Sequence, residues 1–112
     1  KKDMEVITIK TKPLSVNDAF QGRRFKTIAY KNYEVGVSSM LPNIKIPKPP
    51  FKVSYEFGFS SKAADIDNPV KCFTDILQKK YGFNDKDIYE MSLKKKIVKK
   101  GNEYIKFKIE SI

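Results

Sequence analysis

The strongest pattern in the chain is the alternation of apolar and polar residues over positions 51–59. Aromatic or aliphatic side chains stand at every odd position, and lysine, serine, glutamate or glycine stands between them. A period of two is typical of a strand that buries one face. Residues 4–10 alternate with apolar character on both faces and predict a short first strand. The sequence therefore predicts a sheet with one face in a core.

Over positions 27–41, ahead of the alternating segment, the apolar residues recur at helical spacing. Thr27 is a candidate cap for this helix, because its hydroxyl can accept a backbone N–H of the first turn. Pro42 is expected to end the helix, since a proline disfavours helical geometry at the residue before it. Three more prolines follow before position 51, so residues 42–50 are predicted to be a connection.

A second amphipathic helix is predicted to run from position 70 towards Tyr81. Asn68 is a candidate cap, and Pro69 suits the first turn, where the missing N–H costs no intrahelical hydrogen bond. Gly82 is expected to end this helix.

Two more strands are predicted over residues 88–98 and 104–109, joined by a hairpin turn at residues 100–102. Their expected apolar faces are Tyr89, Met91, Leu93 and Ile97 in the first strand, and Ile105, Phe107 and Ile109 in the second. The order β-α-β-α-β-β predicts an α+β fold, with a mixed or antiparallel sheet covered by two helices. Because the chain has 112 residues, we expect a single domain.

The charge balance points to a polyanionic partner. The chain has 23 lysines and arginines against 13 acidic residues, which gives a net charge of +10. Such an excess favours nucleic acid. We find no apolar run near the length of a membrane-spanning helix and no signal-peptide core, so we expect a soluble cytoplasmic protein without membrane attachment.

Missing residue types narrow the chemistry further. Cys72 is the only cysteine and the chain has no histidine. A thiolate zinc site, an intrachain disulfide and His-dependent nucleophilic catalysis are therefore excluded. An enzyme built from this chain must rely on carboxylates and lysines.

A carboxylate pattern surrounds the start of the second helix. In an extended segment, side chains at i and i+2 point the same way, roughly 6.5 Å apart along the chain, so Asp65 and Asp67 can converge on one cation. Magnesium prefers such oxygen ligands. Lys71 lies one helical turn further and is placed to meet phosphate charge, while Asp85, after the helix, could complete the cluster.

A structural interpretation of the same residues stays open. An Asp-X-Asp-Asn segment before a helix is often only a capping, solvated turn. Asp85 is then an ordinary loop acid, and Lys71 simply pairs with Asp75 at the i,i+4 spacing of a helix face.

Together these segments resemble the RusA family of Holliday junction resolvases from phages and prophages. The similarity is carried by Asp65-Ile66-Asp67-Asn68-Pro69-Val70-Lys71, by Asp75-Ile76-Leu77 and by Tyr81-Gly82-Phe83-Asn84-Asp85 followed by Ile88-Tyr89. A weaker similarity covers Pro13-Leu14-Ser15-Val16-Asn17 and Gly22-Arg23-Arg24-Phe25-Lys26-Thr27. The resemblance thus spans nearly the whole chain.

This resemblance implies a magnesium-dependent endodeoxyribonuclease that resolves four-way DNA junctions by paired cuts, with Mn²⁺ as an alternative ion. It implies that Asp65, Asp67 and Asp85 bind the metal ion and that Lys71 assists catalysis. It also implies a homodimer, which suits a substrate with two-fold symmetry, in a bacterial cell and encoded by a phage or prophage. The best-known member of the family has a run of arginines ahead of its first aspartate and a pair of acids in the later loop. Here Lys62-Ala63-Ala64 precedes Asp65, and Asn84 stands before Asp85.

Flexible cations and polar side chains are the expected DNA contacts. We predict this role for Asn17, Arg23, Arg24, Lys26, Lys62, Asn68, Lys94 and Lys96. Lysines 95, 99 and 100 belong to the same basic region, although lysines on an exposed strand also protect against aggregation. Tyr30, Tyr33 and Tyr89 are expected to be core or partly buried aromatics.

Two alternatives come from other functional classes. A non-catalytic basic module would bind nucleic acid without any dependence on magnesium, with its aspartates as structural caps. An RNA-cutting toxin usually relies on His, Tyr or Arg acid–base sets, and the absence of histidine counts against it.

Overall fold

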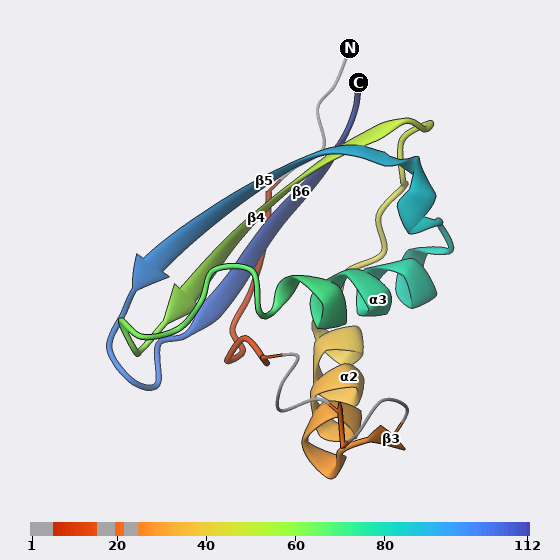
Figure 1. Cartoon of the computed structure of the whole chain (residues 1–112). Helices are drawn as coiled ribbons and strands as arrows, with labels where there is room; N and C mark the ends of the chain where they lie inside the picture. Colours follow the sequence, from red (N-terminus) through yellow and green to blue (C-terminus); the bar gives the residue numbers. More distant parts are fainter. Residues whose placement is uncertain (1–5, 16–19, 22–24) are drawn as a thin grey trace.

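The computed structural model describes residues 6–15, 20–21 and 25–112. Within this part of the chain, two helices, α2 (Ile28–Met40) and α3 (Val70–Tyr81), pack on one face of a four-stranded sheet (Figure 1). The sheet contains β1 (Ile7–Ile9), β4 (Phe51–Phe59), β5 (Ile88–Ile97) and β6 (Tyr104–Ser111). The predicted α+β fold with two helices is confirmed.

The sheet is mixed, and its strand order is β1-β6-β4-β5. β4 runs parallel to β5 and antiparallel to β6, which in turn pairs antiparallel with β1. The predicted hairpin between β5 and β6 is therefore wrong: β4 lies between these strands, and the connection through Gly101 passes from one side of it to the other. The hairpin pattern was a local signal, whereas β4 offers the more apolar surface and takes the centre.

One position explains how closely β4 and β6 fit. Gly58 of β4 stands opposite Tyr104 of β6. A Cβ atom at Gly58 would lie 2.4 Å from Cε2 and 2.5 Å from Cδ2 of the Tyr104 ring. The ring thus occupies the space that any larger residue at position 58 needs.

The core lies between the sheet and the two helices. The five odd-numbered residues of β4 are buried, as are Ile105, Phe107 and Ile109 of β6. Phe73 of α3 meets Tyr55 and Phe107 edge-on, with ring centroids 5.2 and 5.5 Å apart. The Tyr55 hydroxyl and Thr74 Oγ1 share a buried hydrogen bond of 2.8 Å. The periodicity of β4 and β6 therefore predicted their buried faces correctly.

Three of the four helix ends are formed by the residues that the sequence predicted for them. Thr27 caps α2, because its Oγ1 accepts the Tyr30 N–H at 3.1 Å, and α2 ends directly before Leu41 and Pro42. Gly82 ends α3 at φ +73°, the left-handed conformation that favours glycine. The predicted Asn68 cap is wrong: Pro69 occupies the cap position and no side chain caps α3.

β5 forms an edge of the sheet, and the helices leave much of it uncovered. Tyr89, Met91 and Ile97 are 71%, 41% and 46% exposed, and Leu93 is half-buried. The prediction that Met91, Leu93 and Ile97 share one face is confirmed, because all three are in register with buried odd-numbered residues of β4. The expectation that Tyr89 is a core or partly buried aromatic is wrong. Tyr30 and Tyr33 are buried, as expected.

The remaining described elements are small. β2 (Phe20–Gln21) and β3 (Phe25–Lys26) form a short antiparallel pair, which the sequence did not predict. The predicted DNA contacts Asn17, Arg23 and Arg24 lie outside the described residues. None of the helices in the described part of the chain is long and apolar enough to cross a membrane.

Candidate functional site

Asp65 and Asp67 lie in the turns that lead from β4 into α3. Their backbone carbonyls accept the N–H groups of Asn68 and Val70, at 3.3 and 3.2 Å. Both side chains belong to exposed residues, and the Asn68 amide donates to Asp65 Oδ2 at 3.4 Å. No side chain caps α3, so neither carboxylate accepts a cap hydrogen bond at the start of this helix. The capping interpretation of this pair is thus not supported, and the pair remains open to solvent.

A lysine from β5 holds the loop that precedes this pair. Lys95 Nζ donates to the carbonyl oxygens of Lys62, at 2.9 Å, and of Ala64. Two hydrogen bonds from one ammonium group fix the backbone directly before Asp65 against the second half of β5. This anchor was missed in the sequence, because nothing local connects a strand lysine to a loop more than thirty residues earlier.

Asp85 lies at the other end of α3. It begins a short 3-10 helix, Asp85–Asp87, which leads directly into β5. The Asn84 side chain caps this turn by accepting the Lys86 N–H, and Gln78 Oε1 accepts the Asp85 N–H at 2.8 Å. Gln78 therefore ties the Asp85 loop to the last turns of α3.

The three predicted metal ligands do not gather within one chain. α3 has 12 residues and is thus about 18 Å long, and the Asp85 loop folds back beside it, since the Asp85 N–H donates to Gln78 Oε1. Among the described residues, which include all three aspartates, no group of three or more acidic or cysteine side chains is close enough to hold a metal ion. Residues 66–69 form turns, so the extended segment that was expected to align Asp65 with Asp67 is not present.

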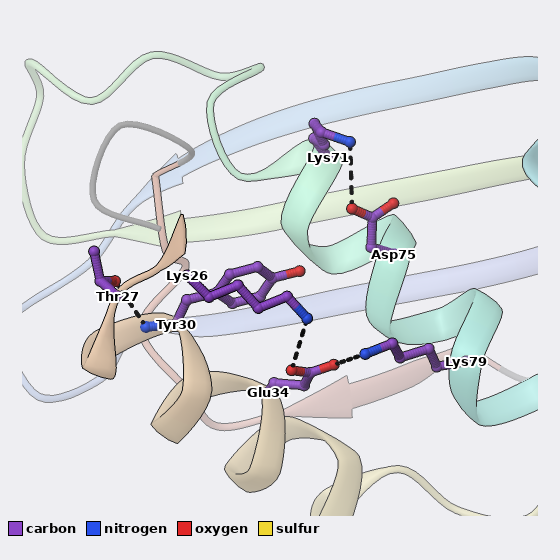
Figure 2. A network of polar contacts seen from close by, with 7 residues as sticks. All are labelled: Lys26, Thr27, Tyr30, Glu34, Lys71, Asp75 and Lys79. Carbon is purple, nitrogen blue, oxygen red and sulfur yellow. Dashed lines mark hydrogen bonds and ion pairs between the residues drawn. The ribbon is translucent and has the colours of Figure 1, made fainter. Parts of the chain in front are cut away.

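A polar row connects the two ends along α3. Lys71 Nζ lies 3.3 Å from Asp75 Oδ2, and the Gln78 amide donates to Asp75 Oδ1 at 3.3 Å (Figure 2 shows the Lys71–Asp75 pair). The i,i+4 pairing of Lys71 with Asp75 is therefore present. Gln78 was missed in the sequence, although its spacing from Asp75 is that of neighbours on a helix surface.

This row borders an open groove of about 450 Å³ between α3 and the first half of β5. Its lining includes Lys71, Thr74, Asp75, Asp85, Ile88, Tyr89 and Met91. Asp65 instead lines a second cavity, of about 200 Å³, at the far end of β4 together with Lys12 and Asn68. The predicted catalytic residues are thus divided between two hollows, one near each end of the parallel strands.

Lys26, a predicted DNA contact, is held by a network between the helices (Figure 2). Its Nζ lies 3.4 Å from Glu34 Oε1 and 5.1 Å from the centre of the Tyr30 ring. Lys79 of α3 reaches the other Glu34 oxygen at 2.6 Å. The hydrogen bond from Lys79, with the charge of Lys26, holds the pKa of Glu34 below its usual 4.5. This network joins α2 to α3 and to β3.

The other described DNA candidates lie on or beside the sheet. Lys62 precedes the aspartate pair and is exposed. Lys94 and Lys96 are exposed on β5, opposite Glu56 and Gly58 of β4. The pKa of Glu56 is lowered, mainly by a hydrogen bond from the Tyr104 hydroxyl and also by nearby lysines. These lysines remain predicted DNA contacts, with side chains accessible to a ligand.

Comparison with known protein families and with curated proteins identifies no relative. No model of a known protein family matches the chain, and no curated protein matches it either.

Proposed function

We propose that this protein is an endodeoxyribonuclease that cuts branched DNA, with Asp65, Asp67 and Lys71 at the reacting phosphate. The observation that carries the proposal is the Asp65–Asp67 pair itself. Both carboxylates are exposed and free of any capping role, and they lie on a turn anchored by Lys95, one helical turn from Lys71. The similarity to the junction-resolvase motif and the net charge of +10 support the same conclusion.

Magnesium suits this pair. Mg²⁺ is commonly held by one or two carboxylates together with waters and substrate phosphates. Asp65 and Asp67 supply such a pair, whereas Asp85 of the same chain lines the groove beside Lys71 and Asp75 and not the hollow that Asp65 lines. When bound, the ion supplies Lewis-acid polarisation of the phosphate. Mn²⁺, which accepts the same oxygen ligands, is the expected substitute.

Lys71 is suited to the negative charge that builds on the phosphate during hydrolysis. Its side chain is 64% exposed, and its ion pair with Asp75 is a surface contact that contributes little to stability. The ammonium group can therefore exchange Asp75 for a phosphate oxygen at small cost. Asp75 then positions Lys71 in the free enzyme.

A four-way junction has two-fold symmetry, and its resolution needs two matched cuts. A homodimer provides two equivalent sites and doubles the positive surface. We therefore propose a homodimer as the active form, acting on the junctions that recombination and repair produce.

The test is cleavage of labelled synthetic four-way junctions in Mg²⁺ or EDTA, beside a linear duplex of matched sequence. We expect paired symmetric nicks that require Mg²⁺ and spare the duplex. Asp67→Asn should lose cleavage and retain junction binding, because binding depends mainly on cations. Glu110→Gln, which removes a carboxylate paired with Lys108 on β6, is the matched control and should cut normally. Undiminished cutting by Asp67→Asn would refute the assignment.

A second candidate is a nucleic-acid-binding module without catalysis. The lack of a three-carboxylate group among the described residues, which include Asp65, Asp67 and Asp85, favours it. This candidate predicts tight junction binding, no cleavage in any divalent metal and no effect of EDTA.

A further inference from the structure

The sheet face opposite the helices, here called the outer face, is covered by no helix in the described part of the chain (Figure 1). Its side chains are those in register with the even-numbered residues of β4, which alternate with the buried core residues. Among the described residues, this face carries six lysines, Lys10, Lys52, Lys94, Lys96, Lys106 and Lys108, against three glutamates, Glu56, Glu90 and Glu110. Such a surplus of positive charge favours a polyanion.

An aromatic ring lies among these lysines. Tyr104 of β6 stands opposite Gly58 of β4, and the missing side chain at Gly58 lets the ring approach the backbone of β4 closely. The Tyr104 hydroxyl donates a hydrogen bond to the Glu56 carboxylate, which holds the ring in this position. Tyr104 is only half-buried. The outer face therefore presents a fixed aromatic surface within a basic surrounding.

The ring borders an open hollow of about 300 Å³ on this face. The lining of the hollow consists of Tyr104 with Thr8, Lys10, Asn102 and Lys106. Lys106 Nζ lies 5.8 Å from the centre of the ring. Lys106 also borders a second hollow, of about 180 Å³, which extends to Lys94 of β5. The two hollows together give an accessible basic surface that reaches across the sheet from β1 to β5.

We propose that the outer face binds single-stranded DNA, with one base stacked on the Tyr104 ring and neighbouring phosphates at Lys10 and Lys96. Lys96 is in register with Gly58, so it lies two strands from Tyr104, about 10 Å across the sheet, while Lys10 borders the ring from the β1 side. A basic surface with an aromatic stacking platform is how proteins hold single strands without sequence preference. This site goes beyond the proposed function, since it contains none of the aspartates; only the choice of DNA as the polyanion rests on that function.

A single strand fits these features better than a duplex does. Bases inside a duplex are stacked on both sides, so Tyr104 could reach a base face only at a duplex end, whereas each base of an unpaired strand offers its face. Glu56 is the acid nearest the ring, but it opposes a phosphate only weakly. Its side chain is 17% exposed, and its carboxylate accepts the Tyr104 hydroxyl and lies 3.8 Å from Lys106 Nζ.

Fluorescence anisotropy of a labelled thymidine strand of about 12 nucleotides, in EDTA, tests this site without any cleavage. Tyr104→Leu should weaken binding at least about fivefold, because it removes the stacking surface, whereas Tyr104→Phe keeps the ring and should bind like the wild type. Lys96→Gln should lower the slope of log affinity against log salt by about 0.7. Lys80→Gln, which removes an exposed lysine of α3, is the matched control and should leave this slope unchanged. Wild-type affinity of Tyr104→Leu overturns the stacking contact.

Photocrosslinking tests the same contact in the unaltered protein. A strand with 5-iodouracil in place of thymine should form its adduct on the peptide that contains Tyr104, as read by mass spectrometry. Adducts confined to other peptides overturn the proposal. A duplex that competes as well as the single strand overturns the preference for unpaired DNA, and an RNA strand that competes better overturns DNA as the occupant.

These results are separable from those of the aspartate site. Asp67→Asn should bind the single strand like the wild type, because Asp67 does not belong to the outer face. A protein that cuts no junction but gives the Tyr104 adduct loses the proposed nuclease function and keeps this binding site. A protein that cuts junctions but binds single strands without any contribution of Tyr104 keeps the nuclease function and loses this site.

Discussion

Substitution of Gly58 by alanine tests the close fit between β4 and β6. The added methyl group would stand 2.4 Å from Cε2 of Tyr104, well inside van der Waals contact, so the ring has to move. This ring is not free, because its hydroxyl donates to Glu56 and Lys106 lies 5.8 Å from its centre. Overpacking of this kind costs about 1–3 kcal/mol, and loss of a hydrogen bond to a charged group costs about 1.5–3 kcal/mol. Since a small shift of the ring relieves part of the clash and weakens the hydrogen bond only in part, we expect Gly58→Ala to lower the free energy of unfolding by about 2–3 kcal/mol.

Urea denaturation followed by circular dichroism measures this change. Gly36→Ala is the matched control, because a Cβ at that helical position meets no atom within 4 Å. Alanine in a helix interior is about 0.5–1 kcal/mol more favourable than glycine, so this variant should be more stable than the wild type. Tyr104→Val should relieve most of the defect when it is combined with Gly58→Ala. A Gly58→Ala variant within about 0.5 kcal/mol of the wild type would refute the steric argument.

Two further predictions concern the network between the helices and the loop before Asp65. The folded-state pKa of Glu34 lies below its unfolded value, so its contribution to stability is present above about pH 4.5 and is lost as the pH falls through the folded pKa. The difference in free energy of unfolding between wild type and Glu34→Gln should therefore shrink on acidification. A difference that stays constant with pH, measured by denaturation, would contradict this. Lys95→Met removes two hydrogen bonds to the loop and should lower the free energy of unfolding by about 1–2 kcal/mol. Amide hydrogen exchange within residues 61–68 should become faster, whereas Lys94→Met should leave it unchanged, and equal exchange in both variants would show that Lys95 is no anchor.

The elements that the sequence predicted well are those whose signals are local. The α2 helix follows from its apolar spacing between a threonine cap and a proline, and β4 follows from an uninterrupted period of two. The pairing of strands could not be predicted in this way, because it depends on which strand offers the best apolar surface to two neighbours. Residues 98–103 have the composition of a hairpin turn, yet they connect strands on opposite sides of β4.

The candidate site was predictable to a similar extent. The positions of Asp65, Asp67 and Lys71 on one turn and the start of one helix follow from the sequence, but Lys71 shares its groove with Asp85 and not with Asp65. The division of these residues between two hollows was not predictable, since it depends on how α3 packs beside β5. The anchor at Lys95 joins segments more than thirty residues apart and leaves no trace in any short motif.

The position of β4 also determines the order in which the chain can fold during synthesis. Both of its neighbours, β5 and β6, follow it in the sequence, and β1 pairs only with β6. No two strands of the described main sheet can therefore pair until β5 has left the ribosome, and β1 waits until Ile105–Phe107 are available. Until then α2 and α3 expose apolar faces that have no sheet to cover. Folding should accordingly be cooperative and late, with nascent chains that depend on chaperones more than those of a protein built from successive hairpins.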